Sequence, residues 1–280
     1  MDASAVRITV LVDNVATGKG LKKEHGLSLW VEVNGKSILF DTGQGKVLSN
    51  NAEKLGVDLE KTDILVLSHG HYDHTGGIPE ILKCSPRLDI YLHLESTRDR
   101  YSTSDAISPK SLGMSKAVEE SLCHLNSNQI HWVTHSVEIL PGVGLTGEIP
   151  RETDFEDVGG AFFLDPQGER KDPIEDDQAL WIQTPEGLVV CVGCCHAGLV
   201  NTIHYVQKVS CCSRVRAVIG GFHLLHANRN RLEKTVQALK SISSPLLAPC
   251  HCSGENAMKE LRSSFPEQMS SCEVGTTFIF

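Results

Sequence analysis

The stretch Ser68-His69-Gly70-His71-Tyr72-Asp73-His74 brings imidazoles and a carboxylate together within a few residues of one another. It follows the apolar run from Ile64 to Leu67, which has the length and composition of a buried strand. Side chains just past the end of such a strand, where the backbone turns, converge on a small volume. Imidazole and carboxylate are ligands of zinc, iron and manganese alike, so the stretch predicts a divalent metal site. We expect His69 and His71 to bind one ion. Asp73 and His74 would bind a second.

One loop cannot complete two coordination shells, so further ligands must come from other strand ends. Suitable histidines follow three more predicted strands: His196 after 188–192, His223 after 217–220 and His251 after 246–248. We expect His196 and His251 to bind the metal ions. His223 is expected to act as a further ligand or as a proton donor.

A carboxylate stands at the end of another predicted strand, in Phe40-Asp41-Thr42-Gly43. Metal-bound histidines usually donate their second ring N–H to such a group, which fixes the orientation of the ring. We therefore expect Asp41 to orient a metal-bound histidine. The alternative is a turn or helix N-cap, a common place for aspartate.

Alternating apolar patterns and turn residues predict strands and helices in both halves of the chain. The predicted strands are 6–14, 27–33, 37–41, 63–68, 89–94, 129–134, 137–140, 179–183, 188–192, 217–220 and 246–248, and the predicted helices are 47–56, 78–83, 199–209, 229–242 and 255–263. Periodicity weakens around 96–176, which we interpret as an inserted cap or loop region facing the substrate. The whole chain, 1–280, is predicted to form a single domain.

Composition narrows the classes of function. The 280 residues include 26 Lys and Arg against 35 Asp and Glu, a formal net charge of −9, so a nucleic-acid partner is not expected. The apolar runs are strand-length, far below the roughly 20 residues of a membrane span. The N-terminus lacks a secretion pattern, and we expect a cytoplasmic protein without a membrane partner. In such a protein the ten cysteines are expected to remain free thiols.

Taken together, these motifs resemble the metallo-β-lactamase fold superfamily of metal-dependent hydrolases, and the resemblance spans nearly the whole chain. It implies an α/β fold, an αββα sandwich of two mixed β-sheets flanked by helices, with one or two divalent ions at the sheet edge. Zinc is the expected ion, with manganese or iron as alternatives. The segments 192–201 and 220–224 are similar to the branch that includes 7,8-dihydropterin-6-methyl-4-(β-D-ribofuranosyl)aminobenzene-5′-phosphate synthase. Loop position and this resemblance make Asp13 and Asn14 expected substrate contacts, together with 98–114.

One departure from the superfamily pattern concerns the ligand that bridges the two ions. The pattern has a Gly-Asp whose carboxylate touches both metals, and here Cys194-Cys195-His196 follows Gly193 instead. We therefore expect His196 to replace the bridging aspartate.

The resemblance implies a hydrolase in which a metal-bound water attacks an ester or phosphoester of a small, anionic or phosphorylated substrate, with His223 and Asp73 as catalytic residues. The alternative is a pterin-transferring synthase that displaces diphosphate. A zinc-stabilised binding module is disfavoured because the clustered donors exceed what one closed site uses. A di-iron redox protein is disfavoured because His69 stands where such proteins commonly carry glutamate. A homo-oligomer is compatible with all of these readings.

Overall fold

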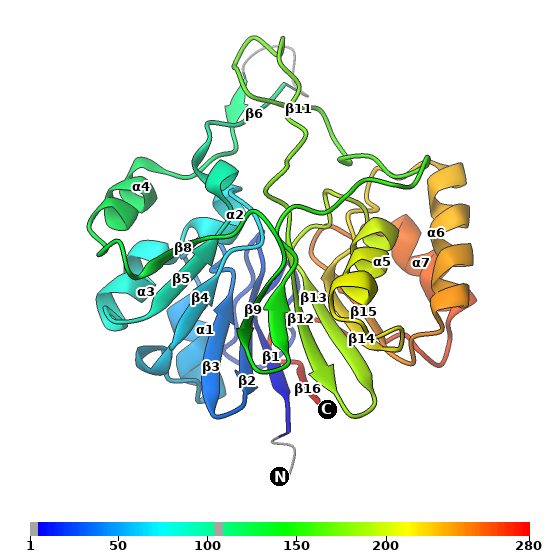
Figure 1. Ribbon diagram of the computed structural model, residues 1–280, viewed down its shortest axis with the longest axis horizontal. Coiled ribbons are helices and arrows are strands. Elements are labelled where there is room, and N and C mark those ends of the chain that lie inside the picture. The colour runs from blue at the N-terminus through cyan, green and yellow to red at the C-terminus, as the bar shows by residue number, and fades with distance from the viewer. Residues whose placement is uncertain (1–4, 104–108) are drawn as a thin grey trace.

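The computed structural model describes residues 5–103 and 109–280. Two mixed β-sheets pack face to face, and helices cover the outer face of each sheet (Figure 1). This is the α/β sandwich expected from the sequence, and its layers position every element of the candidate site.

The strands are β1 (Arg7–Val12), β2 (Ser28–Val33), β3 (Lys36–Phe40), β4 (Ile64–Val66), β5 (Asp89–Leu92), β6 (Tyr101–Ser102), β7 (Lys110–Ser111), β8 (Ile130–Trp132), β9 (Val137–Leu140), β10 (Val143–Leu145), β11 (Phe162–Phe163), β12 (Ala179–Thr184), β13 (Gly187–Val192), β14 (Val215–Gly221), β15 (Leu247–Cys250) and β16 (Thr277–Ile279). The helices are α1 (Leu48–Leu55), α2 (Tyr72–Thr75), α3 (Ile78–Cys84), α4 (Lys116–Cys123), α5 (Leu199–Val209), α6 (Arg229–Ile242) and α7 (Glu255–Ser264), with 3-10 turns η1 (Leu59–Lys61) and η2 (Leu94–Thr97).

The seven-stranded sheet has the order β16-β1-β2-β3-β4-β5-β8, and the six-stranded sheet has the order β15-β14-β13-β12-β10-β9. Strands β3, β4, β5 and β8 run parallel to one another in the first sheet. Strands β13, β14 and β15 do the same in the second. The carboxyl ends of parallel neighbours lie at one edge of a sheet, so the turns that follow these strands can meet there.

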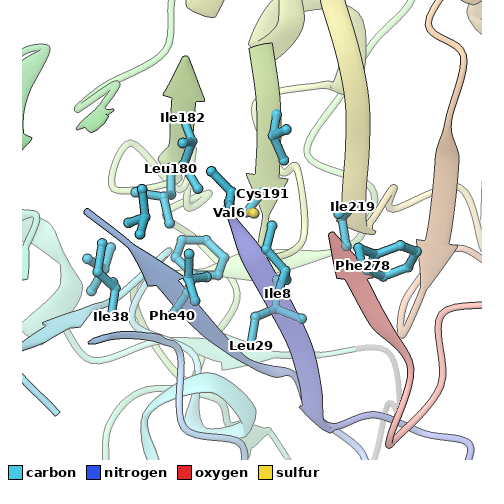
Figure 2. Packing of buried hydrophobic residues seen from close by; sticks show 14 of the residues in the cluster. Val6, Ile8, Leu29, Ile38, Phe40, Leu180, Ile182, Cys191, Ile219 and Phe278 are labelled. Atoms are coloured by element: carbon cyan, nitrogen blue, oxygen red, sulfur yellow. The ribbon is translucent and has the colours of Figure 1, made fainter. Parts of the chain in front are cut away.

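Strand β12 explains how one sheet is buried on both faces. Leu180 and Ile182 point into the core between the sheets, where Phe40 and Ile8 of the other sheet lie (Figure 2). Trp181, one residue along, belongs to the cluster beneath α5, α6 and α7. Because successive side chains of a strand alternate between faces, a nearly continuous apolar run supplies both layers. A third cluster packs α1, α3 and α4 against the first sheet.

Only part of the segment expected to form a cap stands apart from the sandwich. Strand β8 belongs to the seven-stranded sheet, and β9 and β10 belong to the six-stranded sheet. Helix α4 buries Val118 and Leu122 against the seven-stranded sheet. The separate part is a three-stranded sheet in the order β11-β6-β7, which stands above α2 in Figure 1. Residues 104–108 of the expected cap lie outside the described residues. The amphipathic α4 and the short β10 were too brief to be predicted from periodicity.

None of the helices in the described part of the chain is long and apolar enough to cross a membrane.

Candidate metal centre

The turns that follow β3, β4, β13, β14 and β15 meet at one edge of the sandwich and carry the predicted site residues. Three of these residues have left-handed backbone conformations: Asp41 (φ 61°), His223 (φ 46°) and His251 (φ 50°). Such conformations are uncommon for residues other than glycine and tend to occur at functional sites. The turns therefore hold these side chains at a cost that the surrounding structure must offset.

A first cluster contains His69, His71 and His196. Nε2 of His69 lies 2.9 Å from Nδ1 of His71. The ring of His196 lies 4.8 Å from the His69 ring and 5.0 Å from the His71 ring, measured between centroids. All three side chains are buried. The structure thus brings the H-x-H pair together with the histidine that follows β13, as the sequence predicted.

Asp73, His74 and His251 form a second cluster beside the first. Nε2 of His74 lies 3.2 Å from Nε2 of His251. The Oδ2 atom of Asp73 lies 3.9 Å from the first of these nitrogens and 3.5 Å from the second. The clusters adjoin, because the rings of His69 and His74 are 4.3 Å apart between centroids.

Hydrogen bonds to Asp41 determine which ring nitrogens of His69 and His74 carry protons. Ser68 Oγ donates to Asp41 Oδ2 at 2.6 Å, so this hydroxyl is left to accept from Nδ1 of His69 at 2.9 Å. Nδ1 of His74 donates to the same carboxylate at 2.7 Å. In the neutral rings, the Nε2 lone pairs of His69 and His74 therefore point into the clusters. Asp41 lies where the sequence placed it, as the carboxylate that orients a histidine.

The imidazoles of His196 and His251 have the same tautomer. Nδ1 of His196 donates to the carbonyl oxygen of Val158 at 2.9 Å, and Nδ1 of His251 donates to Asn14 Oδ1 at 3.1 Å. Nε2 of His196 is buried and makes no hydrogen bond to any residue in 5–103 or 109–280. Buried nitrogen lone pairs that converge without donors are costly in a protein interior, and a bound cation would satisfy them. The donor set therefore fits a divalent metal.

Burial keeps most of these rings neutral. Desolvation lowers the pKa of His71 to about 3 and that of His251 to about 4, and it also lowers the pKa values of His69 and His196. Neutral imidazoles are the form that binds metal. His74 differs: burial disfavours its charge, but Asp41 and Asp73 outweigh this effect and raise its pKa to about 9. A metal ion would have to displace that proton.

The H-x-H turn is held by a buried ion pair. The backbone N–H of Gly70 donates to Asp176 Oδ2 at 2.7 Å, and Arg100 Nη2 donates to Asp176 Oδ1 at 2.5 Å. A Cβ atom at Gly70 would lie 2.0 Å from the carbonyl oxygen of Ser96, so only glycine fits. Arg100 was part of the stretch expected to contact substrate, but it is 1% exposed and paired with Asp176 and Asp172.

A cavity of about 670 Å³ opens over both clusters. Phe162 of β11 forms one wall, with its ring 5.4 Å from the His71 ring and 5.2 Å from the His196 ring. The ring of His223 lies 4.2 Å from that of His196, and its Nδ1 is buried without a hydrogen-bond partner in the described residues. At the rim, Lys110 Nζ donates to the Tyr72 hydroxyl at 3.0 Å. The cavity thus combines an apolar wall, a histidine cluster and an exposed cation.

Comparison with known proteins identifies the family. A family model described as "Metallo-beta-lactamase superfamily" matches residues 22–93. The 7,8-dihydropterin-6-methyl-4-(beta-D-ribofuranosyl)-aminobenzene-5'-phosphate synthase of Methanocaldococcus jannaschii is 31% identical over 269 residues, which cover 92% of this chain and 90% of the relative. The chain belongs to the metallo-β-lactamase superfamily. The branch resemblance read from the sequence is confirmed by the same relative.

Solved structures agree with this membership of the metallo-β-lactamase superfamily. The crystal structure of Tm1679, "a metal-dependent hydrolase of the beta-lactamase superfamily", has 33% sequence identity and a TM-score of 0.82, and the alignment covers 98% of each chain. A diphosphatase from the PhnP family has 14% identity and a TM-score of 0.56 over 99% of this chain and 98% of the other. The latter likeness concerns the fold alone.

Within the superfamily site, Asp13 has a different position from the one expected. It is 1% exposed, and its carboxylate accepts the backbone N–H groups of His251 and Val15, both at 2.9 Å. The Asp13 carboxylate therefore holds the His251 turn, and Asp13 does not line the cavity. Asn14 lines the cavity but also contacts His251, with its amide nitrogen donating to the carbonyl oxygen at 3.0 Å.

Two residues without a predicted role lie in the superfamily site. Cys194 Sγ is 3.3 Å from Nε2 of His74 and also lies within 4.8 Å of the ligand atoms of His69 and His196. His25 Nε2 lies 3.0 Å from Asp73 Oδ2, at the exposed mouth of the cavity. His196, which was expected to replace the bridging aspartate, belongs to the first cluster only. The Gly193-Cys194 pair, which stands where the superfamily has Gly-Asp, is the feature of the sequence that could have pointed to Cys194.

Proposed function

We propose that this chain is a zinc-dependent hydrolase that cleaves an ester or phosphoester bond of a small anionic substrate. The observation that supports the proposal most directly is the convergence of the Nε2 atoms of His69, His74, His196 and His251 beneath one cavity. The residues proposed to hold two ions are His69, His71 and His196 for one, and Asp73, His74 and His251 for the other. Imidazole-rich sites suit zinc better than manganese, which prefers oxygen ligands.

Metal ions at such a site supply two things: a water with a pKa lowered toward about 7, and positive charge where negative charge develops. The protein orients the ligands and shields the site. Asp41 fixes the ring of His74, and Asp13 fixes the backbone of His251. Phe162 covers the histidine cluster with an apolar ring, which excludes bulk water and strengthens local electrostatic interactions. Lys110 at the rim suits a phosphate or carboxylate of the substrate.

The function is tested with a panel of phosphomonoesters, phosphodiesters, carboxyl esters and lactones. Protein purified without chelators is assayed as isolated, after chelation, and after chelation followed by zinc. We expect hydrolysis of at least one class of ester, loss of that activity on chelation, and recovery with zinc. If the zinc-loaded protein cleaves none of these bonds, or if cleavage survives complete metal removal, the hydrolase proposal fails.

The second candidate is transfer of a pterin group with loss of diphosphate. It is favoured by the 31% identity over 92% of this chain to a synthase whose name describes a dihydropterin product. The aromatic wall formed by Phe162 also suits a flat ring. The candidates are separated by supplying a pterin diphosphate with and without an arylamine acceptor. Diphosphate release that requires the acceptor supports the synthase, and release in water alone supports the hydrolase.

We predict that His223→Gln lowers kcat by about 10²–10⁴-fold, because a positioned general acid contributes about that factor. Metal content and KM should change little, because His223 lies beside the first cluster and is proposed to donate a proton to the leaving group. The measurements are steady-state kinetics and bound metal per chain. Loss of one metal equivalent in this variant would show that His223 is a ligand instead.

A further inference from the structure

Cys194 lies between the two histidine clusters. Its sulfur groups with His69 and His196 on one side and with His74 and His251 on the other, and in each group the ligand atoms lie within 4.8 Å of one another. The side chain is 4% exposed. Of the candidate ligands in these two groups, only Cys194 belongs to both. It is therefore the residue whose position allows contact with both ions.

The separations suit metal ligation. Zinc lies about 2.0–2.1 Å from a histidine nitrogen and about 2.3 Å from a thiolate sulfur, so two ligands of one ion are at most about 4.4 Å apart. Cys194 Sγ is 3.3 Å from Nε2 of His74, inside this limit. The other ligand atoms of each group lie within 4.8 Å of one another. This bound exceeds the limit of about 4.4 Å by a few tenths of an ångström, which a small side-chain rotation can close.

The neighbouring cysteines have different surroundings. Cys195 turns away and packs in the apolar cluster beneath α5, and its backbone is left-handed with φ 56°. Cys252 groups with Cys194 and His223, but with none of the histidines of the two clusters. The chain thus offers one cysteine between the clusters, one beside them and one outside them, which is a set of matched controls.

We propose that the Cys194 thiolate is the ligand shared by the two metal positions, in place of a bridging aspartate. The inference rests on the proposed function, because it assumes that both positions take up metal. A soft sulfur ligand between the ions selects zinc, cobalt or ferrous iron over manganese and magnesium, which prefer oxygen. Cys194 would thereby determine which metal the enzyme uses.

Cobalt titration of the chelated protein tests the assignment, because a thiolate bound to Co²⁺ produces a near-ultraviolet charge-transfer band that imidazole and carboxylate do not. The variants are Cys194→Ser, Cys194→Asp, Cys195→Ser and Cys252→Ser, each checked for folding by circular dichroism. We expect the wild type, Cys195→Ser and Cys252→Ser to show the band. Cys194→Ser should lose it and bind both equivalents more weakly. Cys194→Asp should bind both equivalents without the band and gain affinity for manganese relative to zinc.

The outcomes separate this inference from the function on which it rests. If the wild type takes up no cobalt, the metal-dependent function fails. If it takes up two equivalents without the band, or if the band survives in Cys194→Ser, the function stands and the role of Cys194 is wrong. A band lost in Cys252→Ser alone would assign the sulfur ligand to Cys252. Weakening of a single equivalent in Cys194→Ser would overturn the shared position.

Discussion

His71→Ala is expected to lose bound metal and to lower kcat/KM by about a thousandfold. The side chain is buried in the first cluster with Nδ1 2.9 Å from Nε2 of His69, so its removal deletes a proposed ligand. The expected fall in kcat/KM follows from the several kcal/mol of transition-state stabilisation that a metal ion supplies. Each tenfold change in rate corresponds to about 1.4 kcal/mol. Metal per chain is measured by plasma mass spectrometry, and the rate on the best substrate from the panel.

The matched control is His204→Ala, an exposed histidine on α5. It should keep the metal content and the rate of the wild type. Thermal unfolding of the chelated proteins separates lost ligation from lost folding, because the metal-free His71→Ala and wild-type proteins should unfold at similar temperatures. If His71→Ala keeps a full complement of metal, the first cluster does not bind an ion through this residue.

Arg100→Met is expected to reduce the free energy of unfolding by about 3–5 kcal/mol, the usual cost of removing one partner from a buried ion pair. The guanidinium lies between Asp172 and Asp176, and all three side chains are buried. Without it, the charge of Asp176 is uncompensated in the interior. The variant should also bind metal more weakly, because Asp176 accepts the backbone N–H of Gly70 in the H-x-H turn.

The loss of unfolding free energy in Arg100→Met should grow as the pH rises. In the wild type, burial disfavours ionised Asp176, but Arg100 outweighs this effect and lowers its pKa below 3.8, so the carboxylate stabilises the fold above that pH. In Arg100→Met the folded-state pKa should rise above 3.8, and stability should then fall as pH increases. Urea unfolding at pH 5 and pH 7 should show the larger deficit at pH 7. An equal deficit at both values would contradict the uncompensated charge.

Arg100→Met with Asp176→Asn provides the compensating control. The asparagine oxygen can still accept from Gly70, and it carries no charge. The double variant should recover part of the stability lost at pH 7. No recovery would mean that packing of the arginine stem, rather than its charge, holds the turn.

The fold and the histidine clusters were predictable because they depend on local patterns. Buried strands that end in polar turns indicated where His69, His196 and His251 lie, and parallel strands bring such turns to one edge. The helices over 199–209 and 229–242 begin and end at the predicted residues, because their apolar spacing is long and regular.

The roles of Arg100, Asp13 and Cys194 depend on contacts between distant segments, which periodicity does not encode. Arg100 was expected among the substrate contacts, whereas its true partners, Asp172 and Asp176, lie more than 70 residues away in the sequence. Asp13 was expected at the substrate from loop position and from the family resemblance, yet its carboxylate accepts a hydrogen bond from the backbone of His251. In the sequence, Cys194 looks like an ordinary buried thiol. Its position between the two clusters is visible only in the structure.

The most direct test of the account is the metal content of wild-type protein purified without chelators, measured by plasma mass spectrometry. We predict two equivalents of divalent metal per chain at saturation, with zinc taken up in preference to manganese from an equimolar mixture. Protein that holds no stoichiometric divalent ion, and takes up none on dialysis against zinc, would contradict the metal centre and the function proposed from it.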